Sequence, residues 1–367
     1  MLHSFLRNLF DLRMHNIANR KHTVSEKVLI TGAAGFIGSH VTEFFCEKGV
    51  KVYCLVKKSS NLQFIKHLPI RIIYGDITDP ECLHSALKSM DCVIHIAALA
   101  RDWGRYKDFY DVNVNGTMNV LEACKDNGIK DIIITGSNSS YGEEDSRKVK
   151  DETFPFNSNY RYFMDVVFPC RINYYRNTKA LCTSEALKYA QKESLNITII
   201  EPVWVYGERE FNTGFYEYMR AVKSKVPFLP GNRKNKFHVI YAKDLARAYY
   251  LAYSKKLAGI NRILTGNQQA DNMNRIYTLF CRELGIKKPV NIPKILIYPL
   301  GFFMELIYTV TLIKHPPILT RGRINMFYDN IEYSVKKAAS LLSFKSEYRL
   351  EEGIKRTVKW YKEKHLI

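Results

Sequence analysis

The stretch VLITGAAGFIGSHV, residues 28–41, constrains the fold more than any other part of the chain. It places Gly32, Gly35 and Gly38 three residues apart, between an apolar β-branched run and an amphipathic helical run. Glycines at a strand-to-helix turn let the backbone approach a pyrophosphate closely, and the free N–H groups at the helix N-terminus attract the anion. The stretch therefore predicts the opening strand, turn and helix of a dinucleotide-binding fold.

Short apolar runs alternate with amphipathic helical stretches from Lys27 onward, which is the pattern of a parallel sheet flanked by helices. The predicted strands are KVLITG, VKVYCLV, IRIIYGD, DCVIHIAA, DIIITGS and NITIIEPVWVYG. After Gly207 the alternation weakens, although FHVIYAKDLARAYYLAY has the pattern of a strand that runs into a helix. We therefore expect an α/β fold: a doubly wound parallel sheet of the Rossmann type, with a smaller, mostly helical C-terminal part over the sheet's carboxyl edge.

These patterns divide the chain into three regions. Residues 1–26 are a basic N-terminal extension, residues 27–207 form an NAD(P)-binding Rossmann domain, and residues 208–367 form a substrate-binding region. Within the last region, residues 236–268 are expected to return to the Rossmann core. The extension has apolar residues at helical spacing and few acids, so a leader, a membrane-surface helix and a disordered segment all stay open.

The composition limits the classes of partner and compartment. Lys and Arg outnumber Asp and Glu by 55 to 36, giving a formal net charge of +19 that favours anionic partners. The basic residues are scattered, so a solvated basic surface is preferred to nucleic-acid binding. The 8 cysteines form no C-x-x-C pair, which argues for a reducing, cytoplasmic setting without a disulfide framework or a metal site.

The segment from Lys294 to His315 is apolar and approaches membrane-spanning length, but it contains Pro299, Gly301 and Glu305. A buried or interfacial helix is therefore expected in preference to a transmembrane span. Peripheral membrane contact stays open.

The end of the second predicted strand decides the cofactor type, because it meets the adenosine ribose. Here Lys57 and Lys58 stand where an acid would repel a 2′-phosphate, which favours NADP(H) over NAD(H); the alternative is two solvated loop lysines. Asp76, after the third strand, is suited to contact adenine, although aspartate is also a common turn residue. Ala97 and Ala98, after the fourth, allow the backbone to approach the cofactor.

The pattern Tyr-x-x-x-Lys carries chemistry on a helix, because the cation one turn away lowers the pKa of the phenol and fits it for proton transfer. Three matches occur: Tyr53/Lys57, Tyr175/Lys179 and Tyr333/Lys337. The first lies on a strand, and the third is expected in a solvated, charged helix. The second falls between the fifth and sixth strands, where a helix can present both groups to a nicotinamide. Tyr174 is then expected to pack or to line the site.

A hydroxyl that orients the substrate oxygen is also expected, and the fifth strand ends in ITGSNSSYG. From the residues alone, Ser137, Ser139 and Ser140 all stay open, since serines at strand ends are often turn formers.

Together these motifs resemble the extended short-chain dehydrogenase/reductase family, also called the NAD-dependent epimerase/dehydratase family. The resemblance runs from about Lys27 to the C-terminus and rests on TGAAGFIG, GDITD, NVNGTMNVLEAC, SNSSYG, YRNTKALCTSEAL, EPVWVYGERE and HVIYAKDLARA, in the family's order. Within it, CLVKKSSNLQFI and PKILIYPLGFFMELIY look most similar to 3β-hydroxysteroid dehydrogenases and dihydroflavonol-reductase-like enzymes.

The resemblance implies a role for each matching residue. Tyr175 would be the acid/base, Lys179 its partner, Ser137 the orienting hydroxyl, and Asn113 the asparagine that links the lysine to solvent. The cofactor would be held by Gly32, Gly35, Phe36, Ile37, Gly38, Lys57, Asp76, Ile77, Ala97, Ala98, Tyr175, Lys179, Pro202 and Val203. A homodimer through the helices that bear Asn113 and Tyr175 is also implied.

Three departures from the family pattern stand out. Glu201 replaces the usual Arg before the proline, which puts local pairing in doubt. The interval from Ser137 to Tyr175 contains the insertion NSNYRYFMDVVFPCRI, which is expected to reshape the substrate mouth. Asn138 and Ser139 replace the Asp-Glu pair of the dehydratases, which argues against 4,6-dehydration.

The leading functional hypothesis is an NAD(P)-dependent oxidoreductase that interconverts a secondary alcohol and a ketone on a fairly hydrophobic, sterol- or flavonoid-like substrate. The alternative is a nucleotide-sugar 4-epimerase with tightly bound NAD, in which Arg209, Arg233 and Lys236 would meet a diphosphate. A non-catalytic cofactor-sensing protein is disfavoured, because both Tyr175 and Lys179 are present.

Overall fold

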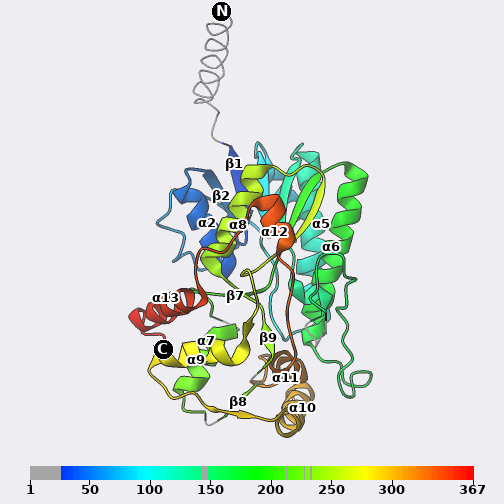
Figure 1. Ribbon diagram of the computed structural model, residues 1–367. Coiled ribbons are helices and arrows are strands. Elements are labelled where there is room, and N and C mark those ends of the chain that lie inside the picture. Colours follow the sequence, from blue (N-terminus) through cyan, green and yellow to red (C-terminus); the bar gives the residue numbers. More distant parts are fainter. Residues whose placement is uncertain (1–25, 143–147, 212–213, 227, 232–233) are drawn as a thin grey trace, which may run out of the picture.

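The main sheet of the computed structural model has seven parallel strands in the order β11-β6-β5-β4-β1-β2-β3 (Figure 1). The structure describes residues 26–142, 148–211, 214–226, 228–231 and 234–367. The strands are β1 (Lys27–Thr31), β2 (Lys51–Val56), β3 (Arg71–Tyr74), β4 (Cys92–His95), β5 (Asp131–Thr135), β6 (Asn196–Pro202) and β11 (Ile260–Thr265). The direction of winding reverses between β1 and β4, so the predicted doubly wound fold is confirmed.

Helices cover both faces of this sheet. On one face lie α2 (Phe36–Glu47) and α8 (Ala242–Lys255); on the other lie α3 (Pro80–Leu87), α5 (Gly116–Asp126) and α6 (Ile172–Glu193). Side chains alternate along each strand, so Val28 and Ile30 join the core under α2 and α8, while Leu29 joins the core under α3, α5 and α6. Burial on both faces explains why the strands read as continuous apolar runs.

The edge strand β11 was not among the strands predicted from the sequence. It belongs to INRILT, and it pairs with β6 from Ile260↔Ile197 to Thr265↔Pro202. The predicted strand NITIIEPVWVYG is in fact two strands, because the chain turns at Val203: β7 (Trp204–Tyr206) leaves the main sheet and pairs with β10 (Val239–Tyr241). As predicted, β10 runs directly into α8.

Short elements at the carboxyl ends of the strands build the site. They are α4 (Tyr106–Phe109), the π-helix η1 (Tyr110–Asn115) and the 3-10 helix η2 (Asn138–Tyr141).

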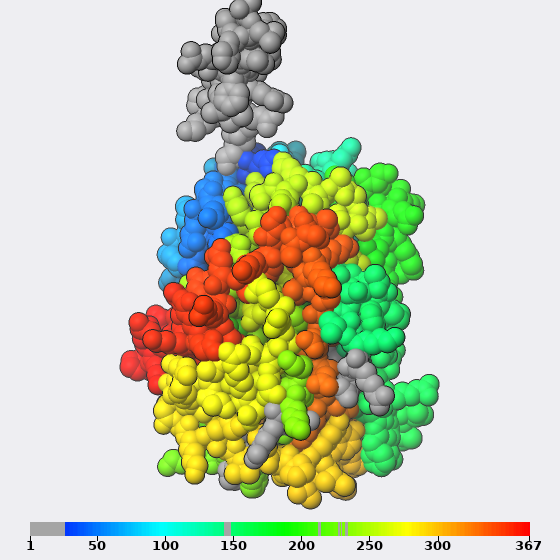
Figure 2. Space-filling model, in the orientation of Figure 1, coloured from blue at the N-terminus to red at the C-terminus, as the bar shows by residue number. Residues whose placement is uncertain are grey.

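The C-terminal part is mostly helical, as expected, and much of it lies beyond the carboxyl edge of the sheet, at the bottom of Figures 1 and 2. Its elements are α7 (Gly214–Lys223), β8 (Phe228–Pro230), β9 (Lys236–Phe237), β12 (Asp271–Asn272), α9 (Met273–Leu284), β13 (Val290–Ile292), α10 (Lys294–Val310), α11 (Arg321–Tyr328), α12 (Lys336–Leu342) and α13 (Leu350–Glu363). The helix α12 packs against α8 and β11.

The expectation of a solvated helix at Tyr333 is wrong. Tyr333 precedes α12, bridges to Lys150 and is buried. Its hydroxyl donates to the backbone oxygens of Asn138 (3.1 Å) and Gly142 (3.2 Å), so the side chain supports η2 instead of facing water.

Among the described helices, none combines the length and the apolar character that crossing a membrane requires. All eight cysteines are free thiols. The predicted extension lies outside the described residues except for Glu26.

Candidate active site

The glycine loop has space for backbone and for nothing larger. Gly32 adopts φ +69°, and a Cβ there would lie 2.7 Å from the nitrogen of Ala97. A Cβ on Gly38 would lie 2.0 Å from the oxygen of Gly32. Gly35 caps α2 without a side-chain hydrogen bond, so the first N–H groups of the helix, at Phe36, Ile37 and Gly38, are not used by a cap. This cradle fits the pyrophosphate of a dinucleotide.

A chain of hydrogen bonds connects this loop to the helix that bears Asn113. The Thr31 hydroxyl accepts from the nitrogens of Ile96 and Ala97, both at 3.2 Å, and lies 2.8 Å from Nδ1 of His95. On the other side, Nε2 of His95 lies 3.0 Å from the Thr117 hydroxyl, which donates to the Asn113 oxygen at 2.7 Å. These partners require a neutral His95 that donates from Nε2 and accepts at Nδ1.

The environment of His95 reinforces that neutral state. The side chain is buried, and desolvation, together with the charge of Lys179, lowers its pKa to about 3. His95 is not among the residues predicted from the sequence, although a histidine inside the apolar run VIHIAA is an unusual feature there.

Lys57 and Asp76 meet at the end of β2 and β3. Their side chains form an ion pair of 2.7 Å between Nζ and Oδ2, and both remain partly exposed. Burial alone would raise the pKa of Asp76, but the bonds from Lys57 and Thr78 outweigh it and lower the pKa. The structure therefore brings together two predicted cofactor residues and leaves Lys58 exposed beside them. Ile77, the next predicted residue, is buried against Gly116.

Tyr175 and Lys179 lie one turn apart near the start of α6. Lys179 is buried, and its Nζ donates to the backbone oxygen of Thr135 at 2.6 Å, which ties α6 to the end of β5. Tyr175 is half-buried. Tyr174 points to different neighbours: its ring packs edge-on against Tyr106 at 5.5 Å between centroids, in keeping with the packing role expected for it.

Asn113 lies in the π-helix η1, buried between α6 and the loop after β4. Its Oδ1 accepts from the nitrogen of Leu99 at 2.7 Å, and its Nδ2 donates to the Thr178 hydroxyl at 3.1 Å. A π-turn inside a helix is a feature that often marks a functional site. The side chain thus joins the loop after β4 to the helix of Tyr175 and Lys179.

Ser137 follows β5 and caps η2. Its Oγ accepts from the nitrogen of Ser139 at 3.2 Å and lies 2.7 Å from the Ser139 hydroxyl. Ser137 stands two residues beyond Thr135, the residue that holds Lys179. Ser140 is fully buried, so it is less available to a substrate than its neighbours.

The remaining cofactor candidates, Pro202 and Val203, are buried at the end of β6, where the backbone nitrogen of Val203 donates to the Thr265 oxygen at 2.9 Å.

Glu201, which replaces the family's usual arginine, pairs with an arginine on β11. Glu201 is buried and accepts from Nε of Arg262 at 3.1 Å and from the Tyr141 hydroxyl at 2.5 Å. The Arg262 guanidinium stacks over the ring of Phe156, 4.5 Å from its centroid. Burial raises the pKa of the Glu201 carboxyl, while Arg262 counteracts the shift. A buried acid is tolerated here because a cation from the neighbouring strand meets it.

Two of the three basic residues proposed for a diphosphate lie in the described segments. Arg209 forms an ion pair of 2.8 Å with Glu43 of α2, and Lys236 lies exposed on β9. Arg233 lies outside the described residues.

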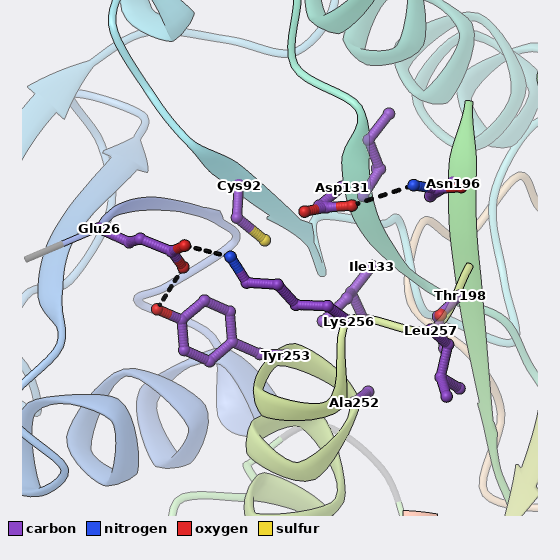
Figure 3. A pocket seen from close by; sticks show the side chains of 11 residues that line it. Glu26, Cys92, Asp131, Ile133, Asn196, Thr198, Ala252, Tyr253, Lys256 and Leu257 are labelled. Atoms are coloured by element: carbon purple, nitrogen blue, oxygen red, sulfur yellow. Dashed lines mark hydrogen bonds and ion pairs between the residues drawn. The ribbon is translucent and has the colours of Figure 1, made fainter. Parts of the chain in front are cut away.

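A small cavity of about 20 Å³ lies at the opposite, amino edge of the sheet (Figure 3). Its wall includes Glu26, Asp131 and Lys256, and the Glu26 carboxylate bonds both Lys256 and the Tyr253 hydroxyl. The volume suits about one water molecule, so this cavity is not a substrate site.

Comparison with known proteins agrees with this geometry. Residues 28–264 match the model of the NAD dependent epimerase/dehydratase family. The chain is 24% identical to a 2-alkyl-3-oxoalkanoate reductase of Shewanella oneidensis, over 89% of this chain and 84% of that protein. It is 26% identical to the decarboxylating sterol-4-alpha-carboxylate 3-dehydrogenase of Mus musculus, over 91% and 90%.

Among solved structures, a UDP-glucose 4-epimerase of Thermotoga maritima superimposes with a TM-score of 0.72 at 22% identity, covering 92% of this chain and 99% of that chain. At that identity the match establishes the shared fold.

Proposed function

Because the chain belongs to the NAD dependent epimerase/dehydratase family, we propose that it is an NAD(P)-dependent oxidoreductase that interconverts a secondary alcohol and a ketone on a hydrophobic substrate. The observation that carries the proposal is the bond from Lys179 to Thr135, which fixes the helix of Tyr175 beside the strand end that leads to Ser137.

The protein's own groups divide the work as follows. The nicotinamide, when bound, supplies or accepts the hydride. Tyr175 gives a proton to the carbonyl oxygen in reduction and removes it from the hydroxyl in oxidation. The positive charge of Lys179, one helical turn away, stabilises the phenolate form of Tyr175, and Ser137 holds the substrate oxygen in line by a hydrogen bond. Asn113 fixes the position of α6 relative to η1 and the loop after β4, through its bonds to Leu99 and Thr178.

For the cofactor we propose NADP(H) in preference to NAD(H). Lys57 is engaged by Asp76, but both side chains are partly exposed, and Lys58 adds a second cation beside them. Lys57 and Lys58 together outnumber the one nearby acid, Asp76, so they leave positive charge that would attract a 2′-phosphate.

For the substrate, two relatives suggest a narrower class. The names of the Shewanella reductase and the mouse dehydrogenase both place a carboxylate on the carbon next to the ketone or alcohol. We therefore propose a 3-oxo or 3-hydroxy carboxylate on a long alkyl or fused-ring body. The test is a turnover screen of 2-alkyl-3-oxoalkanoates with NADPH and NADH, and of 3-hydroxysterol-4-carboxylates with NADP⁺ and NAD⁺. Turnover of UDP-sugars alone would contradict the proposal.

The alternative is a nucleotide-sugar 4-epimerase, because the family includes such enzymes and the same residues would serve. An epimerase retains its NAD through purification and needs none added, whereas the proposed reductase consumes added cofactor. Release of nicotinamide dinucleotide on denaturing the purified protein, measured by absorbance and mass spectrometry, distinguishes them. The engagement of Arg209 by Glu43 disfavours the diphosphate site.

A homodimer through the helices that bear Asn113 and Tyr175 remains a proposal from the family resemblance. Sedimentation equilibrium of the full chain tests it.

A further inference from the structure

The helix α10 presents an apolar side to solvent. Its outward stripe consists of Leu296, Leu300, Phe303, Ile307 and Val310, which are 64, 53, 56, 56 and 72% exposed. They are spaced by three or four residues, so they share one side of the helix. On the inward side Ile297, Gly301 and Glu305 are buried. A helix on a water-facing surface normally shows the reverse pattern, with polar side chains outward.

The insertion before α6 adds a second exposed apolar segment. Phe163, Met164, Val166 and Val167 are all exposed there, Val166 by 91%. Together with the five stripe residues of α10 they make one surface, called the apolar face below. Figure 2 shows the insertion (green) and α10 (yellow-orange) at the same end of the molecule.

A ring contact and a buried arginine hold these two segments together. Phe163 of the insertion packs edge-on against Phe302 of α10, at 5.4 Å between ring centroids. Arg321 is fully buried and donates to the backbone oxygens of Phe163 and Phe168, the latter at 2.7 Å. The same guanidinium bonds both carboxylate oxygens of Glu305, at 3.0 and 3.1 Å. The apolar face is therefore a fixed feature of the fold.

The fully exposed charges on the two segments are basic. Glu305 is the only acid between residues 294 and 318, and it is buried in its pair with Arg321. In the insertion the only acid is Asp165, half-buried and accepting from the nitrogen of Cys170 at 2.7 Å. The exposed ionisable residues at the ends of the two segments are Arg161, Lys314 and His315. A second copy would bring like charges together, whereas anionic lipid headgroups would attract them.

The face also lies at the functional end of the molecule. The insertion runs directly into α6, which bears Tyr175, and the segment after α10 is tied to the loop after β4 by a bond of 2.9 Å from Trp103 Nε1 to the Ile313 oxygen. A large exposed apolar surface of this kind marks an interaction site. None of the described helices is suited to span a bilayer, so a helix with such a face would lie along the membrane surface.

We propose that the apolar face docks the protein onto bilayers that contain anionic phospholipid, with α10 and the insertion in the headgroup region. This docking does not depend on the reaction that the site performs.

The test is flotation of the full chain with vesicles of phosphatidylcholine, with and without phosphatidylglycerol. Wild type is expected to float with the anionic vesicles. Phe303→Glu/Ile307→Glu and, separately, Val166→Glu are each expected to reduce the vesicle partition coefficient by about tenfold or more, because each places a carboxylate among acyl chains. The matched control is Ile260→Glu, an exposed apolar position on β11, which is expected to float like wild type.

These variants leave residues 1–25 intact, so unchanged flotation of both face variants would assign binding to another surface and overturn the proposal. A dimer that sediments as such without vesicles, and that Phe303→Glu/Ile307→Glu dissociates, would assign the face to a second copy instead.

A second measurement does not require a disruptive charge. The indole introduced by Phe303→Trp should be quenched by brominated phosphatidylcholine in anionic vesicles, while that introduced by Ile260→Trp should not. Equal quenching at the two positions, or none at either, overturns the proposal.

Discussion

The Nζ of Lys179 donates a hydrogen bond of 2.6 Å to the backbone oxygen of Thr135, the last residue of β5. One contact thereby sets the position of α6 relative to the strand whose extension carries Ser137. The predicted acid/base, its partner lysine and the predicted orienting hydroxyl come from two elements that this bond connects.

Replacement of Tyr175 by Phe should lower kcat by about 10³-fold, because the variant cannot transfer the proton while its ring fills the same space. The dissociation constant of NADPH, measured by fluorescence titration, should change by less than about threefold, because the cradle at Gly32 and Gly38 is untouched. The matched control is Tyr174→Phe, which alters a ring packed on Tyr106 and should retain turnover. An active Tyr175→Phe enzyme would exclude the mechanism.

The structure makes the choice between Ser137 and Ser139 testable. Ser137→Ala should lower kcat by about 10²-fold through loss of a bond to the substrate oxygen. Ser139→Ala should have a smaller effect, because its hydroxyl lies 2.7 Å from that of Ser137 and acts through it. Steady-state kinetics of both variants with one substrate provide the comparison, and the reverse ranking would move the orienting role to Ser139.

Cofactor preference should depend on Lys57. Lys57→Met should weaken NADPH binding by about tenfold, the loss expected for one bond to a charged group, and NADH binding by less than about twofold. Lys51→Met, at an exposed lysine at the start of β2, is the control. Titrations at one fixed salt concentration measure the dissociation constants of NADPH and NADH for each variant. Equal loss for the two cofactors would show that Lys57 does not meet a 2′-phosphate.

The local patterns of the sequence predicted a large part of this molecule, because glycine spacing and β-branched runs report on nearby backbone. The family prediction and the doubly wound sheet are confirmed. The pairing of β11 with β6 was not predictable in the same way. It joins segments about 60 residues apart, and the sequence of a short strand does not specify which other strand it pairs with.

In the candidate site, too, local patterns were predictable and long-range contacts were not. Tyr175 and Lys179 are four residues apart and visible as a pattern, whereas the partner of Glu201 lies 61 positions away on Arg262. For Tyr333 the local sequence was misleading. Its charged neighbours indicated a solvent-exposed side chain, whereas long-range hydrogen bonds to Asn138 and Gly142 hold it in a buried position.

The side chains of Glu201 and Arg262 should be energetically coupled, so that removing one charge destabilises the fold more than removing both would lead one to expect. Arg262→Met leaves a buried carboxyl without its cation and should reduce the free energy of unfolding by about 3 kcal/mol. Glu201→Leu/Arg262→Met removes both charges and should cost less than the sum of the two single variants. Urea unfolding of wild type and the three variants completes the cycle. Strict additivity would mean that the two side chains do not interact energetically.

Buried histidine should make the protein sensitive to mild acid. The pKa of His95 is lowered to about 3 by burial, below the value of about 6.5 that it has when unfolded. Between these values the unfolded chain binds more protons, so the contribution of His95 to stability is complete above pH 6.5 and is lost as pH falls toward 3. Protonation would also break the bond that Nδ1 accepts from Thr31.

From pH 7.5 to pH 5, wild type should therefore lose about 2 kcal/mol through His95 alone. His95→Gln should lower stability at pH 7.5 but flatten this decline by that amount. His40, whose pKa burial also lowers to about 3, contributes equally to both proteins. The matched control is His67→Gln, at an exposed position, which should keep the wild-type slope. Urea midpoints across the pH series measure the slopes, and parallel curves for wild type and His95→Gln would show that His95 does not contribute to the acid sensitivity.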